Sequence, residues 1–169
     1  MGDDIVVRLA APGDAAALLE LQHRLDRQTE FMLLEPGERD DDPGPLAARL
    51  ADTSSYVVVA MAGTSAAGYV EVSALPYARA RRTGYVVMGV SAEHAGRGLG
   101  RALLQAAVEE ARARGLARLE LTVMEHNRRA LNLYLGCGFQ VEGLRRDALD
   151  VAGVRVGEYY MGLLLKGEA

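Results

Sequence analysis

The sequence predicts an α+β fold with α/β/α layering around a mixed, mostly antiparallel sheet of six to seven strands. Three observations predict it. Half of the 169 residues are apolar, which is enough to bury one sizeable core. Short β-branched runs alternate with segments of helical spacing along the chain. Residues 85–123 read as strand, helix and strand, which gives the sheet a central, right-handed parallel crossover.

Hydrophobic periodicity places the elements of the first half. Leucines at helical spacing follow Gly13-Asp14, so a helix that packs on the sheet begins there. An acidic loop candidate follows, and Pro43 and Pro45 mark the start of a second helix that ends near Asp52. Two further β-branched runs are joined by a short Gly-containing segment, which predicts an antiparallel hairpin. The expected strands of this half are 5–9, 56–61 and 68–73.

The second half contains the parallel unit. Residues 85–90 are apolar on both faces, as expected for a strand buried in the middle of a sheet. Gly89 interrupts this run and predicts either a bulge, the close approach of a ligand, or room for a neighbouring side chain. Residues 99–114 form the clearest helix, with Gly115 at its end. The remaining expected elements are strand 119–123, helix 127–135 and a terminal hairpin of 139–151 and 154–165 that turns at Ala152-Gly153.

Composition and charge exclude several classes of protein. A net charge of -4 argues against a nucleic-acid partner, which would require a basic face. No apolar run approaches the length that spans a membrane, and the acidic start Met1–Asp4 is unlike a secretory signal. Cys137 is the sole cysteine, so an internal disulfide is excluded. We therefore expect a cytoplasmic protein without membrane association.

The segment Ala95–Arg101 carries the strongest chemical signal. Its alternate glycines let backbone N–H groups point outward at the start of a helix, where the helix dipole adds positive charge. This geometry predicts a diphosphate cradle, although a tight strand-to-helix corner would use the same residues. A P-loop is excluded because Gly100 precedes Arg101-Ala102, and a dinucleotide fold is disfavoured because Glu120 lies near the start of its strand.

This loop and a later segment together resemble the GNAT superfamily of acyl-CoA-dependent N-acyltransferases. Gly98 and Gly100 match the family's Arg/Gln-x-x-Gly-x-Gly/Ala loop, but Ala95 stands where the family usually has Arg or Gln. Residues 125–134, followed by Gly138-Phe139, resemble its second CoA-contacting segment. The resemblance implies one domain over residues 1–169, with an acceptor-side half at 4–83 and a CoA-binding half at 84–165.

The resemblance also implies the roles of particular residues. A backbone N–H at Val90 would face the thioester carbonyl if Gly89 forms a bulge, and Tyr134 would donate a hydrogen bond to the departing thiolate. Asn127 fits both a CoA contact and an ordinary helix N-cap. The expected cofactor-binding residues are Met88, Val90, Ala95, Gly96, Arg97, Gly98, Leu99, Gly100, Arg101, Asn127, Ala130 and Tyr134.

A charged residue within a central strand is the first candidate for the general base. Glu71 lies in a strand that would neighbour the buried strand, where it could accept a proton, or it could simply face solvent from that strand. Glu93 and Glu35 are further candidates. The acidic run 38–42 would attract a cationic acceptor or form a solvated loop. Among aromatic residues, Tyr77 and Phe31 lie in loops where they could line an acceptor pocket. Three widely spaced histidines, His23, His94 and His126, predict no metal site.

These inferences combine into one functional hypothesis. We expect an N-acetyltransferase that uses acetyl-CoA and an amine acceptor, a primary amine of a small molecule or amino acid, which attacks directly. The alternatives are a protein N-terminal or lysine acetyltransferase and a non-catalytic CoA-binding regulatory domain, against which Tyr134 argues. A homodimer is compatible with this hypothesis.

Overall fold

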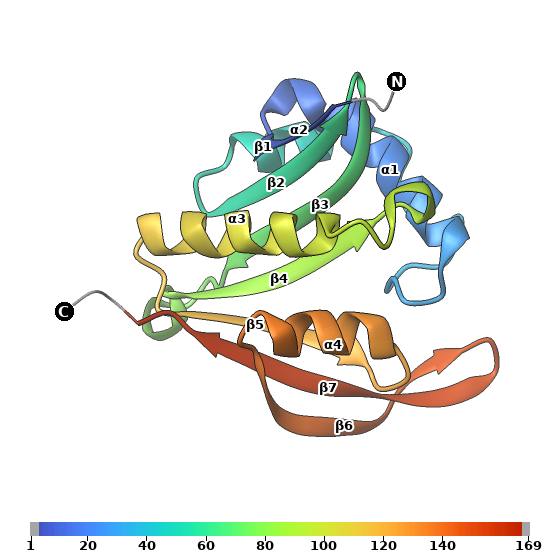
Figure 1. Cartoon of the computed structure of the whole chain (residues 1–169), viewed down its shortest axis with the longest axis vertical. Helices are drawn as coiled ribbons and strands as arrows, with labels where there is room; N and C mark the ends of the chain where they lie inside the picture. Colours follow the sequence, from blue (N-terminus) through green and yellow to red (C-terminus); the bar gives the residue numbers. More distant parts are fainter. Residues whose placement is uncertain (1–3, 167–169) are drawn as a thin grey trace.

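The computed structural model describes residues 4–166 and shows a seven-stranded sheet in the order β1-β2-β3-β4-β5-β7-β6 (Figure 1). The strands are β1 (Ile5–Leu9), β2 (Ser55–Ala62), β3 (Ser65–Ala74), β4 (Thr83–Val90), β5 (Arg118–Met124), β6 (Gln140–Val151) and β7 (Val154–Leu164). The helices are α1 (Ala15–Gln28), α2 (Gly44–Ala51), α3 (Leu99–Ala113) and α4 (Arg128–Gly136). Short 3-10 turns lie at Pro12–Asp14, Ala78–Ala80 and Ala92–His94.

Helices cover both faces of the sheet, so the core has two layers. Leucines of α1 and Leu46 of α2 pack against one face, here called the α1 face, together with Tyr69 of β3. The adjacent β3 residue Val70 points the other way, into a larger cluster with α3 and α4 on the α3 face. Figure 1 shows α3 and α4 lying side by side in front of the sheet, with both helices beginning on the right. The predicted α/β/α layering is confirmed.

The predicted elements are confirmed in type and order. β4 and β5 run parallel and are joined through α3, whereas the other neighbouring strands are antiparallel. The terminal hairpin turns at Ala152 and Gly153, whose φ angles of 49° and 81° suit a two-residue hairpin turn. The sheet is thus mixed and mostly antiparallel, as the sequence predicts.

Gly89 makes room for a side chain and does not form a bulge with β3. The β3–β4 register runs without a shift from Gly68↔Val90 to Ala74↔Gly84. A Cβ at Gly89 would lie 2.6 Å from Cδ1 of Leu25, a buried residue of α1. Of the alternatives left open for Gly89, the structure therefore supports room for a neighbouring side chain, because the absent Cβ lets α1 pack directly on β4 and the β3–β4 register shows no bulge.

Candidate active site

A gap opens in the middle of the sheet. Within the described residues, β4 and β5 pair only at Thr83–Tyr85 and Arg118–Glu120, and their remaining residues diverge. The Tyr85 hydroxyl and Thr122 Oγ1, 2.8 Å apart, form a hydrogen bond across the start of this gap. Beyond it, Met88, Gly89 and Val90 are partly exposed although β4 lies in the middle of the sheet. The gap leaves backbone groups of β4 available to an extended ligand.

The glycine-rich segment lies at the open end of this gap. Gly96 and Gly98 have φ angles of 76° and 78°, which favour glycine, and Gly98 is the N-cap of α3. The N–H of Ala102 bonds to the carbonyl of Gly98 at 3.1 Å, so the preceding amides of the first turn have no partner within the helix. The segment therefore presents N–H groups and the positive end of the α3 dipole at one place.

Helix α4 runs alongside the glycine-rich segment. A Cβ at Gly96 would lie 3.4 Å from Nη2 of Arg129, and one at Gly100 would lie 3.2 Å from Leu133. One at Gly136 would lie 2.9 Å from Nη2 of Arg101. The Arg101 side chain thus reaches the end of α4, so only its backbone stays a candidate for the predicted cofactor contact.

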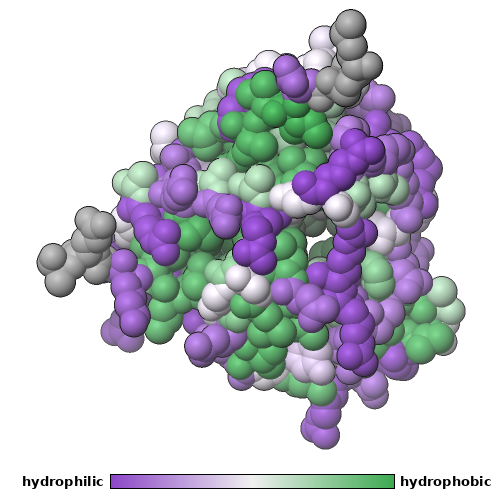
Figure 2. All heavy atoms as spheres, viewed as in Figure 1, coloured by the Kyte–Doolittle hydropathy of each residue, from purple (hydrophilic) through white to green (hydrophobic). Residues whose placement is uncertain are grey.

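The first turns of α3 and α4 border a surface hollow. Figure 2, in the same view as Figure 1, shows this hollow to the right of centre, surrounded by hydrophilic side chains. Both helices present their N-terminal ends on this side of the molecule. Two helix dipoles therefore favour an anion in the same place.

Tyr134 lies in α4 and belongs to the core cluster against which Met88 and Val90 of β4 pack. It is 8% exposed, and its ring packs on Phe139 with centroids 5.8 Å apart. Burial raises the pKa of Tyr134 well above the ordinary tyrosine value, so its hydroxyl stays protonated at neutral pH. Tyr85, whose hydroxyl spans the start of the gap, is near enough to raise the pKa of Tyr134 further. Within residues 4–166 the structure records no hydrogen bond to the Tyr134 hydroxyl. It is therefore a proton-bearing group beside the gap.

Asn127 and Ala130 shape the start of α4. Oδ1 of Asn127 accepts a hydrogen bond from the N–H of Ala130 at 3.2 Å. The N-cap interpretation of Asn127 is thereby confirmed, while its contact with CoA stays a prediction.

The three candidate bases lie in different surroundings. Glu71 is on the α1 face of β3, opposite Val87 of β4, and its side chain is 18% exposed with Nη2 of Arg49 3.4 Å away. Glu93 accepts a hydrogen bond from Nε2 of Gln28 at 3.0 Å, and a hydrogen bond from its own backbone lowers the pKa of Glu93. Glu35 lines a pocket beyond the end of α1. Glu71 is the candidate that lies beside the central strand.

That pocket, of about 300 Å³, lies between the segment after α1, the end of β5 and the β6–β7 turn. Apolar side chains make up much of its lining, namely those of Met32, Leu34, Met124, Leu149 and Val151. Charged side chains also border it, namely those of Asp26, Arg27, Glu30, Glu35 and Asp150. We call it the α1 pocket, because Asp26 and Arg27 of α1 line it, and Met124 places it at the end of β5.

Phe31, Tyr77 and the acidic run 38–42 were predicted to lie near an acceptor, but none of them lines this pocket. Phe31 stacks on His126 with ring centroids 4.9 Å apart and thereby ties the segment after α1 to the start of α4. Tyr77 is 70% exposed. Because it precedes β4, whereas the glycine-rich segment follows β4, it lies at the opposite end of that strand. In the run 38–42, Asp42 accepts from the N–H of Gly44 at 2.9 Å, a local turn interaction.

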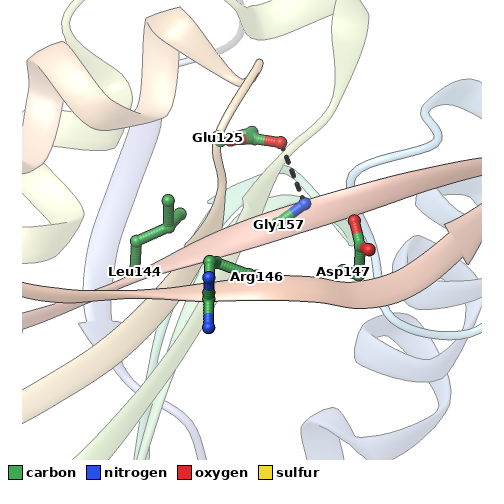
Figure 3. A pocket seen from close by; sticks show the side chains of 5 residues that line it. All are labelled: Glu125, Leu144, Arg146, Asp147 and Gly157. Carbon is green, nitrogen blue, oxygen red and sulfur yellow. Dashed lines mark hydrogen bonds between the residues drawn. The ribbon is translucent and has the colours of Figure 1, made fainter.

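A second, wider cavity of about 700 Å³ lies beside the terminal hairpin (Figure 3). Glu125, Leu144, Arg146, Asp147 and Gly157 line it. Oε1 of Glu125 accepts a hydrogen bond from the N–H of Gly157 at 3.0 Å, so this carboxylate joins the end of β5 to β7.

Several residues at the site were missed from sequence alone. Tyr85, Thr122 and Arg129 approach the gap or the glycine-rich segment only through strand register and helix packing. A signal for Arg129 was present in the sequence, because it lies next to Ala130 in the segment that matches the family. No group of three or more His, Cys, Asp or Glu side chains suited to a metal ion occurs within residues 4–166. In the same part of the chain, every helix is too short or too polar to cross a bilayer.

Comparisons with known proteins agree with this geometry. The model of the acetyltransferase (GNAT) family matches residues 18–139. N-alpha-acetyltransferase RimI of Mycobacterium tuberculosis is 38% identical over 116 residues, which cover 67% of this chain and 72% of that protein.

Solved structures agree as well. A GNAT acetyltransferase from Streptococcus pneumoniae superposes with a TM-score of 0.89 at 28% identity, covering 96% of this chain and 100% of that one. YncA of Salmonella typhimurium, a putative acetyltransferase solved with acetyl-CoA, gives a TM-score of 0.86 at 23% identity, covering 98% and 96%.

Together, the divided sheet, the glycine-rich helix start and these relatives define the class: the protein is an acetyltransferase. More narrowly, the chain belongs to the acetyltransferase (GNAT) family. The prediction of an acetyl-CoA-dependent N-acyltransferase is confirmed at this level.

Proposed function

We propose that the protein transfers the acetyl group of acetyl-CoA to a primary amine, which attacks the thioester directly. The observation that carries this proposal is the gap between β4 and β5, with the glycine-rich segment at its open end and Tyr134 beside it. A relative with the same fold, YncA, was solved with acetyl-CoA as its cofactor, which supports this choice of acyl donor.

The chain's own groups suggest how the substrates are held. The amides of Gly96, Gly98 and Gly100 receive the diphosphate, and the edge of β4 at Met88 and Val90 pairs with the extended pantetheine arm. Ala95, Arg97, Leu99 and Ala130 complete the predicted cofactor surface. These contacts place the thioester near Tyr134.

Chemistry then follows from the groups around the thioester. The amine nitrogen forms a bond to the carbonyl carbon, the carbon–sulfur bond breaks, and sulfur leaves as a thiolate. Ser91 donates its N–H to the carbonyl of Ala67 in β3, so the alternating N–H of Val90 faces the gap without a bulge and stabilises the developing oxyanion. The hydroxyl of Tyr134 donates a hydrogen bond to sulfur. A solvent molecule carries the amine proton to Glu71.

We infer that the acceptor amine is the α-amino group of a polypeptide N-terminus, while a free amino acid or small amine is the second candidate. The resemblance to N-alpha-acetyltransferase RimI favours the first. We assign the acceptor to the α1 pocket, where apolar side chains make up much of the lining and favour an apolar residue near the amine. Among the described residues that line it, carboxylates outnumber the one cation, Arg27, and so disfavour an acidic residue. A cytoplasmic location, one domain with two halves, and a homodimer stay predictions.

An assay of free CoA thiol release tests both the proposed acetyl transfer and the proposed acceptor. The panel should contain leucine, leucinamide, a short peptide beginning with leucine, and the same peptide with a blocked N-terminus and one lysine. We expect turnover to be highest with the free peptide. Preference for leucine or leucinamide would favour the small-molecule acceptor, activity on the blocked peptide would favour lysine acetylation, and binding of acetyl-CoA without turnover of any amine would favour a regulatory domain.

A further inference from the structure

Four arginines occur in the sequence at or just before the first turns of α3 and α4. They are Arg97 and Arg101, at the start of α3, and Arg128 and Arg129, at the start of α4. Residues 94–108 and 126–141 contain no Asp or Glu, although the whole chain has a net charge of -4. None of the four takes part in an ion pair found within residues 4–166. This cationic cluster lacks an anionic partner within the described chain.

Arg129 is the member of the cluster whose guanidinium lies against the glycine-rich segment. Its Nη2 is 3.4 Å from the position that a Cβ of Gly96 would occupy. Gly96 and Gly98 both have a positive φ, a backbone conformation in which successive N–H groups can form an anion-binding concavity. Arg101, in contrast, reaches Gly136 at the other end of α4. Charge and backbone donors therefore converge at Gly96 through Arg129.

The segment's own cations are Arg97 and Arg101, but position 95 is an alanine, and Gly96 and Gly98 carry no side-chain donor. The guanidinium of Arg129 reaches Gly96 from another helix. A guanidinium beside backbone N–H groups suits the oxygens of a diphosphate, because it offers paired donors in a fixed plane.

We propose that Arg129 binds the diphosphate of acetyl-CoA together with the amides of the glycine-rich segment, and so replaces a donor at position 95. This assignment rests on the proposed acetyl-CoA site. It makes Arg129 an affinity and positioning residue for the coenzyme, and it leaves the chemical step to the groups beside the thioester.

Calorimetric titration of Arg129→Gln with CoA and with 3′-dephospho-CoA tests the assignment. The expected loss of affinity is about 10- to 100-fold and equal for both ligands, since both retain the diphosphate. At saturating acetyl-CoA, kcat should stay within about twofold of wild type while KM for acetyl-CoA rises. Transfer from S-acetylpantetheine, which lacks the diphosphate, should be the same for both proteins.

The matched control is Arg128→Gln, because adjacent helical residues point about 100° apart and the neighbouring charge should matter less. Unchanged affinity of Arg129→Gln for both ligands would overturn the proposal. A loss confined to CoA would instead assign Arg129 to the 3′-phosphate and would also overturn it. Failure of the wild-type protein to bind either ligand would reject the acetyl-CoA site itself, which separates that failure from an error about Arg129.

Discussion

At the scale of single residues, burial determines what Tyr134 can do. Its hydroxyl lies in the core cluster beside β4, and the raised pKa keeps it protonated wherever an amine substrate is partly neutral. A protonated hydroxyl can donate to a thiolate but cannot act as a base. These properties support the proposed role of Tyr134 as hydrogen-bond donor to the leaving thiolate.

Tyr134→Phe retains the ring that packs on Phe139 and removes only the hydroxyl. We expect kcat to fall about 10- to 1,000-fold, because the leaving thiolate loses its donor. The melting temperature should change little, which thermal unfolding alongside the assay would check. A wild-type rate in the folded variant would reject the role.

Glu71 differs because it is separated from the gap by one strand and lies near Arg49. Glu71→Gln should lower the rate chiefly below the pKa of the acceptor amine, where most of the amine is protonated, and higher pH should partly restore it. Full pH–rate profiles measure this. Glu93→Gln tests the second candidate base in the same way, and a profile of Glu71→Gln that overlays wild type would leave Glu71 as a strand-face residue.

At the scale of elements, the contact between α1 and β4 depends on the absence of one side chain. Gly89→Ala would place a methyl group 2.6 Å from Leu25, inside the α1 layer. We expect a loss of about 1–3 kcal/mol in the free energy of unfolding from overpacking. Urea denaturation of the single variants and of Gly89→Ala with Leu25→Ala checks it. The double variant should lose less free energy of unfolding than the two single variants lose together, because the shortened side chain leaves room for the new methyl group. Strictly additive losses would show that Leu25 is not the residue that the methyl group contacts.

Elements were predictable because each has a local signature. The apolar run of β4, the helical spacing of α3 and the turn at Ala152-Gly153 depend on neighbours in sequence. The role of Gly89 was not predictable, because a bulge and a neighbouring side chain both favour glycine. Likewise, Arg129 approaches Gly96 only once α4 packs alongside the glycine-rich segment. The roles of such residues depend on contacts between elements, which the local sequence pattern does not specify.

At the scale of the whole molecule, three buried tyrosines link stability to alkaline pH. Burial raises the pKa of Tyr69 to about 12 and raises those of Tyr56 and Tyr134 as well. The folded state therefore binds more protons than the unfolded state above the ordinary tyrosine pKa of about 10. The stability contributed by the neutral hydroxyls is complete below that pH and is lost as pH rises through the folded values.

The melting temperature should accordingly decline progressively above about pH 10. Part of the tyrosinate absorbance should appear only together with loss of the circular dichroism signal. Tyr56 also donates a hydrogen bond of 2.6 Å to the carbonyl of Ala107, which Tyr56→Phe would remove. Simultaneous titration of every tyrosine before unfolding would contradict this prediction.

The gap between β4 and β5 also has a consequence for backbone protection in the free protein. The amide protons of a central strand ordinarily exchange slowly, because the strand is hydrogen-bonded to a neighbouring strand on each side. Residues 86–90 of β4 and 121–124 of β5 face each other without such pairing. We expect some of their amides to exchange with deuterium as fast as those of an edge strand, and to become protected when acetyl-CoA occupies the gap. In that complex the coenzyme would act as an additional strand, which completes a sheet that the polypeptide alone leaves open.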